Sequence, residues 1–376
     1  MKKYGLVLLF LLFCRSGFPQ TTPEISILTC SPGDEIYSVF GHSAIRVKIE
    51  STGYDRIYNF GMFDFDISNF VIKFALKRLE YSLGIQYIDD FLEEYTSEGR
   101  SVTEQKLHLT HIQAVALTER LHYLYLPENR YYFYAFSEKN CSTEIRDLLA
   151  EVGVTFPSYP IRETTRELIG SYLERHLWLR FGINLVLGKN VDREITVYES
   201  MFLPDYLEKE LDAVYINNKK LADAKKTLNT VENKEQELPS FFFSPLFIFS
   251  LLAGIVTVWN NKTFYAVLLS IMGIIGLFLC FLWIASGHIE VKNNLNILWC
   301  NPFHLIYIPF FIKNRNTGLF SLFFLTVLFA SFVVWITGMQ HFDTAIVPLL
   351  ISLAIIHFRQ LKSSVKEKKL PSGLQP

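Results

Sequence analysis

The chain has 376 residues, a formal net charge of -1 at pH 7, and a composition that is 50% hydrophobic and 15% aromatic. A near-neutral chain offers no basic surface for a phosphate backbone, so we exclude nucleic acid as a partner. The apolar residues are concentrated after Pro239, which divides the chain into a mixed N-terminal part and an apolar C-terminal part.

The first twenty residues have the pattern of a secretory signal peptide. A short basic start at 1–3 precedes an apolar stretch at 6–13 that is too short to cross a bilayer, and a polar stretch containing Gly17 and Pro19 follows. We therefore expect 1–20 to be removed and the mature chain to begin at about Thr21, outside the cytoplasm.

The segment 21–204 is long enough for one globular core. Stretches with the hydrophobic spacing of helices occur in it together with stretches that have the two-residue alternation of strands. We expect a mixed α+β domain in the periplasm. The predicted helices are 68–79, 87–96, 111–125, 141–152 and 163–176, and the predicted strands are 25–29, 43–49, 55–60, 101–109 and 131–136.

A histidine opens the second predicted strand. Ile45, Val47 and Ile49 alternate with charged residues, which indicates a strand with one buried face, and His42 stands at its start. The next predicted strand carries Asn59, the nearest polar side chain able to orient the imidazole.

A cysteine opens the predicted helix 141–152. Ile145, Leu148 and Leu149 recur at helical spacing behind Cys141, and Asn140 is placed as the N-cap. Unpaired amides and the positive end of the helix dipole favour the thiolate in a first turn, and the thiolate is the reactive form.

The cysteine count leaves several interpretations open. Of five cysteines, Cys14 lies in the leader, Cys280 and Cys300 lie in apolar runs, and the exported segment keeps Cys30 and Cys141. Two cysteines in an oxidising compartment are compatible with a disulfide, with a nucleophile beside a bystander, or with inert buried thiols.

Other chemistry is sparse in the exported segment. No HExxH or CxxC pattern occurs, so we predict no metal and no cofactor. A glycosidase needs two carboxylates facing a sugar, and nothing in the acidic runs between 64 and 94 selects such a pair.

Beyond residue 204 we expect a charged helical linker at 205–239, a transmembrane domain at 240–358 and a basic cytoplasmic tail at 359–376. Runs of mostly apolar residues give an all-α unit of about five membrane helices. These runs are 241–258, 264–285, 297–312, 319–337 and 344–358. The third run carries Asn301, Pro302 and His304, so a re-entrant segment is the alternative there.

The distribution of basic residues predicts the orientation. Lys262, Lys313, Arg315 and five basic residues of the tail fall on one side of this arrangement, which the positive-inside rule makes the cytoplasmic side. The globular part is then periplasmic, and the C-terminus is cytoplasmic.

The outer loop 288–296 is more polar than a turn requires. It holds His288, Asn294 and Asn296, which we treat as candidate binding residues. The loop is either an interfacial connection anchored by Trp299 or a surface that docks the globular domain, or a substrate, against the outer leaflet.

Four short runs carry a family resemblance. The runs 29–35 (TCSPGDE), 40–46 (FGHSAIR), 58–61 (YNFG) and 140–143 (NCST) resemble the Lnb N-terminal periplasmic domain family. The resemblance continues through the membrane half, at the polar residues of 288–302, and so covers nearly all of the mature chain. It implies a multi-pass protein of the cytoplasmic membrane with a periplasmic N-terminal domain.

The chain is also similar, in the order of its motifs, to circularly permuted papain-like hydrolases of the NlpC/P60 and lecithin:retinol acyltransferase kind. In those proteins a strand bearing the histidine precedes the Asn-Cys pair that opens a helix. The resemblance implies Cys141 as nucleophile and His42 as general base, and the position of Asn59 on the next strand makes it the candidate orienting residue. Ser43 and Asn140, beside these residues, are further candidate binding residues.

Three functional interpretations follow. The first is a membrane-anchored cysteine hydrolase or acyltransferase that acts on an amide or ester of the cell envelope. The second is a non-catalytic envelope factor that binds or helps mature a secreted partner protein. The third is a structural domain joined by a Cys30–Cys141 disulfide. In each case membrane lipid is a partner.

Overall fold

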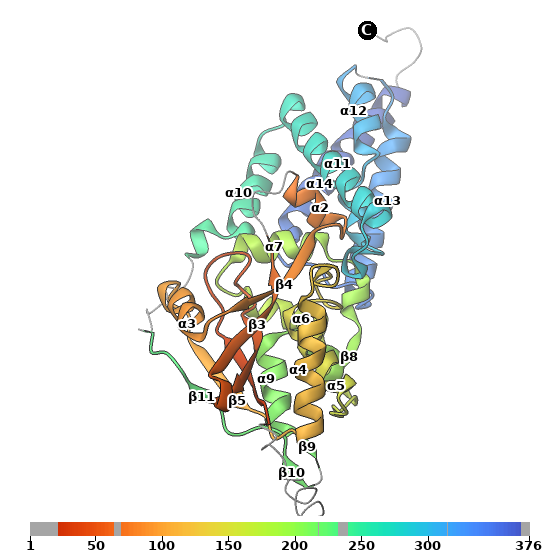
Figure 1. The fold of residues 1–376 in the computed structure, drawn as a ribbon. Coiled ribbons are helices and arrows are strands. Elements are labelled where there is room, and N and C mark those ends of the chain that lie inside the picture. Colours follow the sequence, from red (N-terminus) through yellow and green to blue (C-terminus); the bar gives the residue numbers. More distant parts are fainter. Residues whose placement is uncertain (1–21, 64–68, 217, 232–239, 314, 370–376) are drawn as a thin grey trace, which may run out of the picture.

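The computed structural model describes residues 22–63, 69–216, 218–231, 240–313 and 315–369. An α+β domain extends to residue 231, and a helical unit begins at residue 240 (Figure 1). This confirms the predicted fold class, although the first domain continues beyond the predicted end at 204. The predicted signal peptide, 1–20, lies outside the described residues, as does the end of the predicted tail, 370–376.

A seven-stranded antiparallel sheet forms the centre of the first domain. Its strand order is β11-β5-β1-β2-β3-β4-β6. The strands are β1 (Glu24–Cys30), β2 (His42–Ile49), β3 (Tyr54–Met62), β4 (Glu80–Gln86), β5 (Val102–Lys106), β6 (Tyr131–Phe133) and β11 (Lys226–Thr227). Two small two-stranded pairs accompany it, β7 (Pro160–Thr164) with β8 (Glu194–Thr196), and β9 (Tyr215–Ile216) with β10 (Lys219–Lys220).

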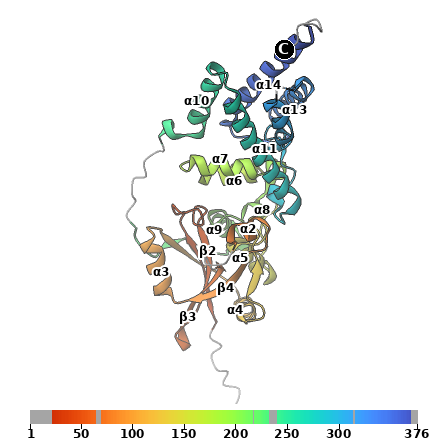
Figure 2. The same ribbon diagram turned by 90° about the horizontal axis from the view of Figure 1, so that it is seen from above.

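Helices cover both faces of this sheet, α3 on one side and α4 and α5 on the other (Figure 2). The helices are α2 (Phe70–Ala75), α3 (Ile88–Ser97), α4 (His111–Tyr125), α5 (Cys141–Glu151), α6 (Thr165–Tyr172), α7 (Leu177–Val186), α8 (Val197–Ser200) and α9 (Pro204–Ala213). Short 3-10 turns lie at Glu50–Thr52 and Lys189–Asp192.

The strands have two buried faces. Ile45 and Tyr58 join the core shared with α4, α5 and α9, whereas Ala44 and Ile57, one residue away on each strand, join the smaller core shared with α3. Because successive side chains of a strand point to opposite faces, a strand buried on both sides becomes nearly continuously apolar. Strand β1 shows this burial, because all of its residues from Ile25 to Cys30 are buried.

The structure corrects four points of the prediction for the first domain. Strand β4 occupies 80–86, where no element was predicted, and the predicted helix 68–79 shortens to α2. The predicted helix 163–176 divides into the end of β7 and α6. The predicted linker beginning at 205 opens with α9, whose Leu207 and Leu211 are fully buried in the main core and whose Glu208 and Glu210 are buried as well, so this helix is packed as part of the first domain.

The membrane unit contains five α-helices among its described residues. They are α10 (Pro245–Val258), α11 (Lys262–Ala285), α12 (His304–Ile312), α13 (Gly318–Ile336) and α14 (Ile346–Lys369), with 3-10 turns at Phe241–Phe243, Ile289–Val291 and Leu295–Leu298. Of these, α11, α13 and α14 are long and apolar enough to cross a membrane. The run predicted as a span at 297–312 is broken. Only nine residues of it form α12, about 14 Å of helix, which is less than half of a hydrocarbon core.

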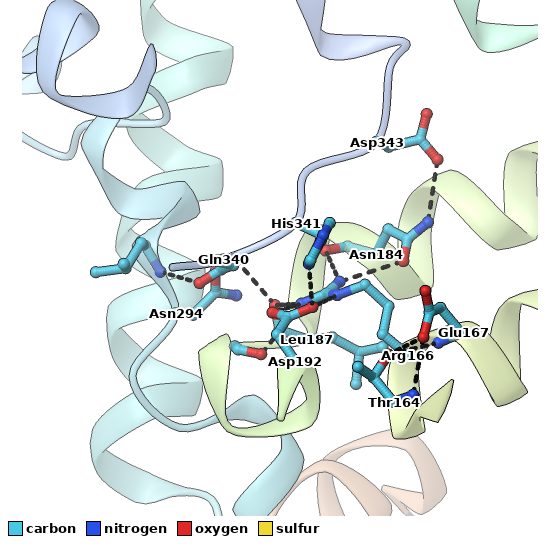
Figure 3. A network of polar contacts seen from close by, with 12 residues as sticks. Thr164, Arg166, Glu167, Asn184, Leu187, Asp192, Asn294, Gln340, His341 and Asp343 are labelled. Carbon is cyan, nitrogen blue, oxygen red and sulfur yellow. Dashed lines mark hydrogen bonds and ion pairs between the residues drawn. The ribbon is translucent and has the colours of Figure 1, made fainter. Parts of the chain in front are cut away.

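The periplasmic domain is docked on the membrane unit through α7 and the segment after it. Phe181, Leu185 and Val186 of α7 pack against the core of the membrane unit. Arg166 forms a buried ion pair with Asp192 (2.6 Å), and the chain connecting α13 to α14 joins this network, as Figure 3 shows. The two parts therefore share polar as well as apolar contacts.

Candidate thiol site

The N-terminus of α5 is built to present Cys141. The Asn140 side chain accepts hydrogen bonds from the N–H groups of Ser142 and Thr143 (both 2.9 Å), and Thr143 accepts from the Asn140 N–H in return (2.7 Å). This reciprocal cap fixes the first turn of the helix. Cys141, its first residue, is partly buried, in contrast to the fully buried Cys30.

His42 occupies the first position of β2, beyond a turn that requires glycine. Gly41 has a φ of 79°, and a Cβ there would lie 2.8 Å from the Cys30 carbonyl oxygen. This backbone returns the chain so that His42 pairs with Cys30 across β1 and β2. His42 is also half-buried, and its ring stacks on Tyr95 of α3.

The structure brings three of the predicted residues together. The imidazole of His42 faces the Cys141 thiol closely enough that each group shifts the pKa of the other. Its Nε2 lies 2.6 Å from Oδ1 of Asn59 on the adjacent strand β3. Nδ1 is therefore the ring nitrogen left for the sulfur, which is the arrangement of a thiol, its base and an orienting amide.

Two further residues fix which way these groups point. Asn59 donates from Nδ2 to Oε1 of Gln86 (2.8 Å), and Gln86 donates from Nε2 to a carboxylate oxygen of Glu94 (2.8 Å). An ionised carboxylate only accepts, so each amide in the chain must present its oxygen toward the histidine. His42 consequently carries its proton on Nε2 when neutral, and the lone pair of Nδ1 faces Cys141.

The electrostatic environment favours the charged pair. Burial acts to raise the pKa of Cys141, but the imidazole charge and the hydrogen bond from His42 outweigh it and leave that pKa below its ordinary value. Burial acts to lower the pKa of His42, but the facing thiolate and the hydrogen bonds to Cys141 and Asn59 leave it raised. The two shifts together favour a thiolate and an imidazolium.

Two serines complete the surroundings of the sulfur. The backbone N–H of Ser43 and the hydroxyl of Ser142 both favour the thiolate and lower the pKa of Cys141. The pairing of β2 with β3 begins at Ile45, which leaves the Ser43 amide available to the thiol. The buried hydroxyls of Ser43 and Ser142 lie 3.1 Å apart, so one chain of hydrogen bonds reaches the sulfur.

The Cys30–Cys141 disulfide, one of the alternatives that the sequence left open, is not formed in the structure. Cys30 and Cys141 are both free thiols. Cys30 is completely buried beside Tyr95, and burial raises its pKa far above the ordinary value. Cys30 is therefore a core residue, although it lies directly across the strand pair from His42.

The candidate binding residues make their contacts within the protein. The Ser43 hydroxyl bonds to Ser142, and the Asn140 amide donates to the carbonyls of Phe136 (2.7 Å) and Phe202 (2.8 Å). In the outer loop, three side chains donate to backbone carbonyls of the periplasmic domain. His288 reaches Phe74 of α2, while Asn294 and Asn296 reach the C-terminal turn of α7. The loop therefore docks the globular domain.

Sequence reasoning missed Gln86, Glu94 and Ser142. Alternation of Tyr81, Leu83 and Ile85 was the available signal for β4, and recognising that strand would have placed Gln86 at its end. Its alignment with Asn59 depends on the pairing of β3 with β4, which no local pattern specifies.

Two family models match the chain. Residues 16–170 match the model described as the Lnb N-terminal periplasmic domain, and residues 232–368 match the model described as the Lnb transmembrane domain. The first match contains Cys141, His42 and Asn59. No curated protein and no solved structure matches the chain.

Proposed function

The chain belongs to the Lnb family and carries both the periplasmic and the transmembrane domain of that family, and we propose that it is a membrane-anchored cysteine hydrolase or acyltransferase that acts on an amide or ester of the cell envelope. The single observation that carries this proposal is the grouping of Cys141, His42 and Asn59, in which Asn59 holds the imidazole (2.6 Å) and His42 lowers the pKa of the thiol. A thiol that serves only packing is normally sealed and protonated, as Cys30 is.

The proposed reaction is nucleophilic acyl transfer. The Cys141 thiolate attacks the carbonyl carbon, a C–S bond forms, and the carbonyl electrons move to oxygen. The Cys141 N–H, which forms no hydrogen bond to any other described group, is the nearest donor for this oxyanion at the helix N-terminus. When the C–N or C–O bond breaks, the His42 imidazolium gives its proton to the leaving amine or alcohol, and a thioester remains.

The second half of the reaction defines the product. Neutral His42 takes a proton from the incoming nucleophile, which attacks the thioester and releases the thiolate. Water gives a hydrolase, and an amine or alcohol gives an acyltransferase. A site docked on the membrane unit suits an acceptor held at the membrane surface. In this proposal the thiol, base and orienting amide of a permuted papain-like arrangement carry out the reaction. The proposal also places the C-terminus in the cytoplasm.

The test uses the intact protein in detergent with p-nitrophenyl acetate as the acyl donor. We expect a burst of p-nitrophenol and an acetyl group on Cys141 by mass spectrometry, both lost in Cys141→Ala. Iodoacetamide should label Cys141 at neutral pH faster than it labels N-acetylcysteine. If neither the acyl adduct nor the faster labelling appears, the non-catalytic partner-binding function becomes the better proposal.

A further inference from the structure

The membrane unit reaches the segment that carries the nucleophile. Glu290, in the outer loop between α11 and α12, is 4% exposed. Its Oε1 accepts a hydrogen bond from the backbone N–H of Ser137 (3.0 Å) and another from the Ser137 hydroxyl. Ser137 precedes Cys141 by only four residues and lies in the turn between β6 and α5.

The surroundings of Glu290 form a junction of three segments. The N–H of Gly287, from the same outer loop, donates to the Leu76 carbonyl after α2 (3.4 Å), and Lys77 pairs with Glu138 (2.6 Å) beside Ser137. The outer loop, the turn after α2 and the turn before α5 therefore meet. Close packing fixes this meeting, since a Cβ at Gly287 would lie 2.9 Å from the Lys77 Cβ.

A buried carboxylate is costly unless hydrogen bonds satisfy it, and charge-assisted bonds are the strong ones. Glu290 takes both donors of one residue, so it fixes the backbone and the side chain of Ser137 together. Tyr134, three residues before Ser137, is influenced by both groups. Burial raises the pKa of Tyr134, and the charges of Tyr81, Cys141 and Glu290 raise it further.

We propose that Glu290 is a positioning residue for Cys141. Through this carboxylate the membrane unit holds the turn from which α5 begins, so that the thiol meets His42 in the reactive geometry only when the two parts are docked. The inference rests on the proposed function and adds to it that the transmembrane domain is part of the thiol site and not merely its anchor.

The test measures iodoacetamide labelling of Cys141 against pH in the intact protein in detergent. Glu290→Ala should slow labelling at neutral pH on the order of tenfold and move the labelling profile to higher pH, because a displaced thiol loses the His42 contact. Glu290→Gln should keep the wild-type profile, because its amide oxygen still accepts from Ser137. Ser137→Ala, which keeps the N–H, should lie between them.

Asp343→Ala is the matched control. It removes the Asn184–Asp343 bond that docks the same two parts on the α7 side (Figure 3), and it should leave the labelling profile unchanged. Equal slowing in both variants would mean general loosening and would overturn the proposal. Should Glu290→Ala fail to fold, an unchanged profile in Ser137→Ala would overturn it instead. Slow labelling of the wild-type protein would count against the proposed function itself, whereas fast labelling in Glu290→Ala would remove only this inference.

Discussion

Nε2 of His42 and Oδ1 of Asn59 lie 2.6 Å apart on adjacent antiparallel strands, and this contact determines how the imidazole faces the thiol. An amide oxygen at this nitrogen requires the N–H there and leaves Nδ1 as the base. The same contact stabilises the imidazolium, which donates from both nitrogens. One hydrogen bond thus serves both protonation states that the proposed acyl transfer would use.

Removing this orienting group should reduce turnover without removing the nucleophile. In Asn59→Ala the imidazole loses its partner, and we expect the acylation rate to fall on the order of 10- to 100-fold. Asn59→Asp, which keeps an acceptor, should retain most of the rate. Single-turnover release of p-nitrophenol measures this, and equal rates for wild type and Asn59→Ala would refute the orienting role.

The pH dependence follows from the two pKa shifts. The thiolate forms as pH rises through the lowered pKa of Cys141, so iodoacetamide labelling should rise at lower pH than for N-acetylcysteine. The imidazolium is lost as pH rises through the raised pKa of His42, so cleavage of an amide, which needs a protonated leaving group, should decline above it.

A histidine variant isolates the cause of the lowered thiol pKa. In His42→Ala, burial remains while the largest opposing effect is gone, so the labelling profile of Cys141 should move to higher pH than in the wild-type protein. The Ser43 N–H and the Ser142 hydroxyl still donate and limit the shift. A profile that stays in place would show that His42 does not set the pKa of the thiol.

The two exported cysteines should behave oppositely. Cys30→Ala should keep acyl transfer, because Cys30 is a sealed core thiol, at a cost of about 1 kcal/mol in stability for a small buried side chain. Cys141→Ser should abolish the reaction without lowering protein abundance. Mass spectrometry of protein prepared without reductant should find no Cys30–Cys141 bridge, and finding one would restore the disulfide interpretation.

The parts of this site differ in how well the sequence specifies them. Helix α4 matches the predicted 111–125, because a capping box at Thr110 and helical spacing of its buried residues mark it locally. The meeting of Cys141 with His42 followed from the order of motifs in a resembling family. Local patterns alone place Cys141 on a helix and His42 on a strand, and they leave the distance between these two residues undetermined.

The contacts of Gln86 and Glu290 could not be predicted from the sequence, because they depend on strand pairing and on the contact between the two domains. Gln86 reaches Asn59 only through the register of β3 with β4, and Glu290 reaches Ser137 across more than a hundred residues of chain. The charges of α9 suggested a linker because the periodicity of Leu207 and Leu211 is brief. Long-range relationships of this kind are set by tertiary packing, which overrides composition.

Gly41 offers a test of the backbone that delivers His42. Gly41→Ala introduces a Cβ 2.8 Å from the Cys30 carbonyl oxygen at a φ of 79°, so the turn must shift. We expect loss of on the order of 1–3 kcal/mol of stability and a lower labelling rate at Cys141. Gly53→Ala is the comparison, since its φ is also positive but its Cβ would meet nothing within 4 Å. Equal labelling in the two variants would contradict a role for the Gly41 turn.

The orientation of the membrane unit gives the last prediction. Lys262, Lys313 and Arg315 lie in the connections that the positive-inside rule assigns to the cytoplasm, and α14 ends in a further group of lysines. A reporter fused after Gln375 should therefore be active in the cytoplasm, and one inserted near Asn233 should be active in the periplasm. α10 and α12 are both shorter than a full span, so these two segments together decide the parity: the two reporters differ if both segments complete a crossing or if neither does. If both report the same side, only one of the two segments crosses.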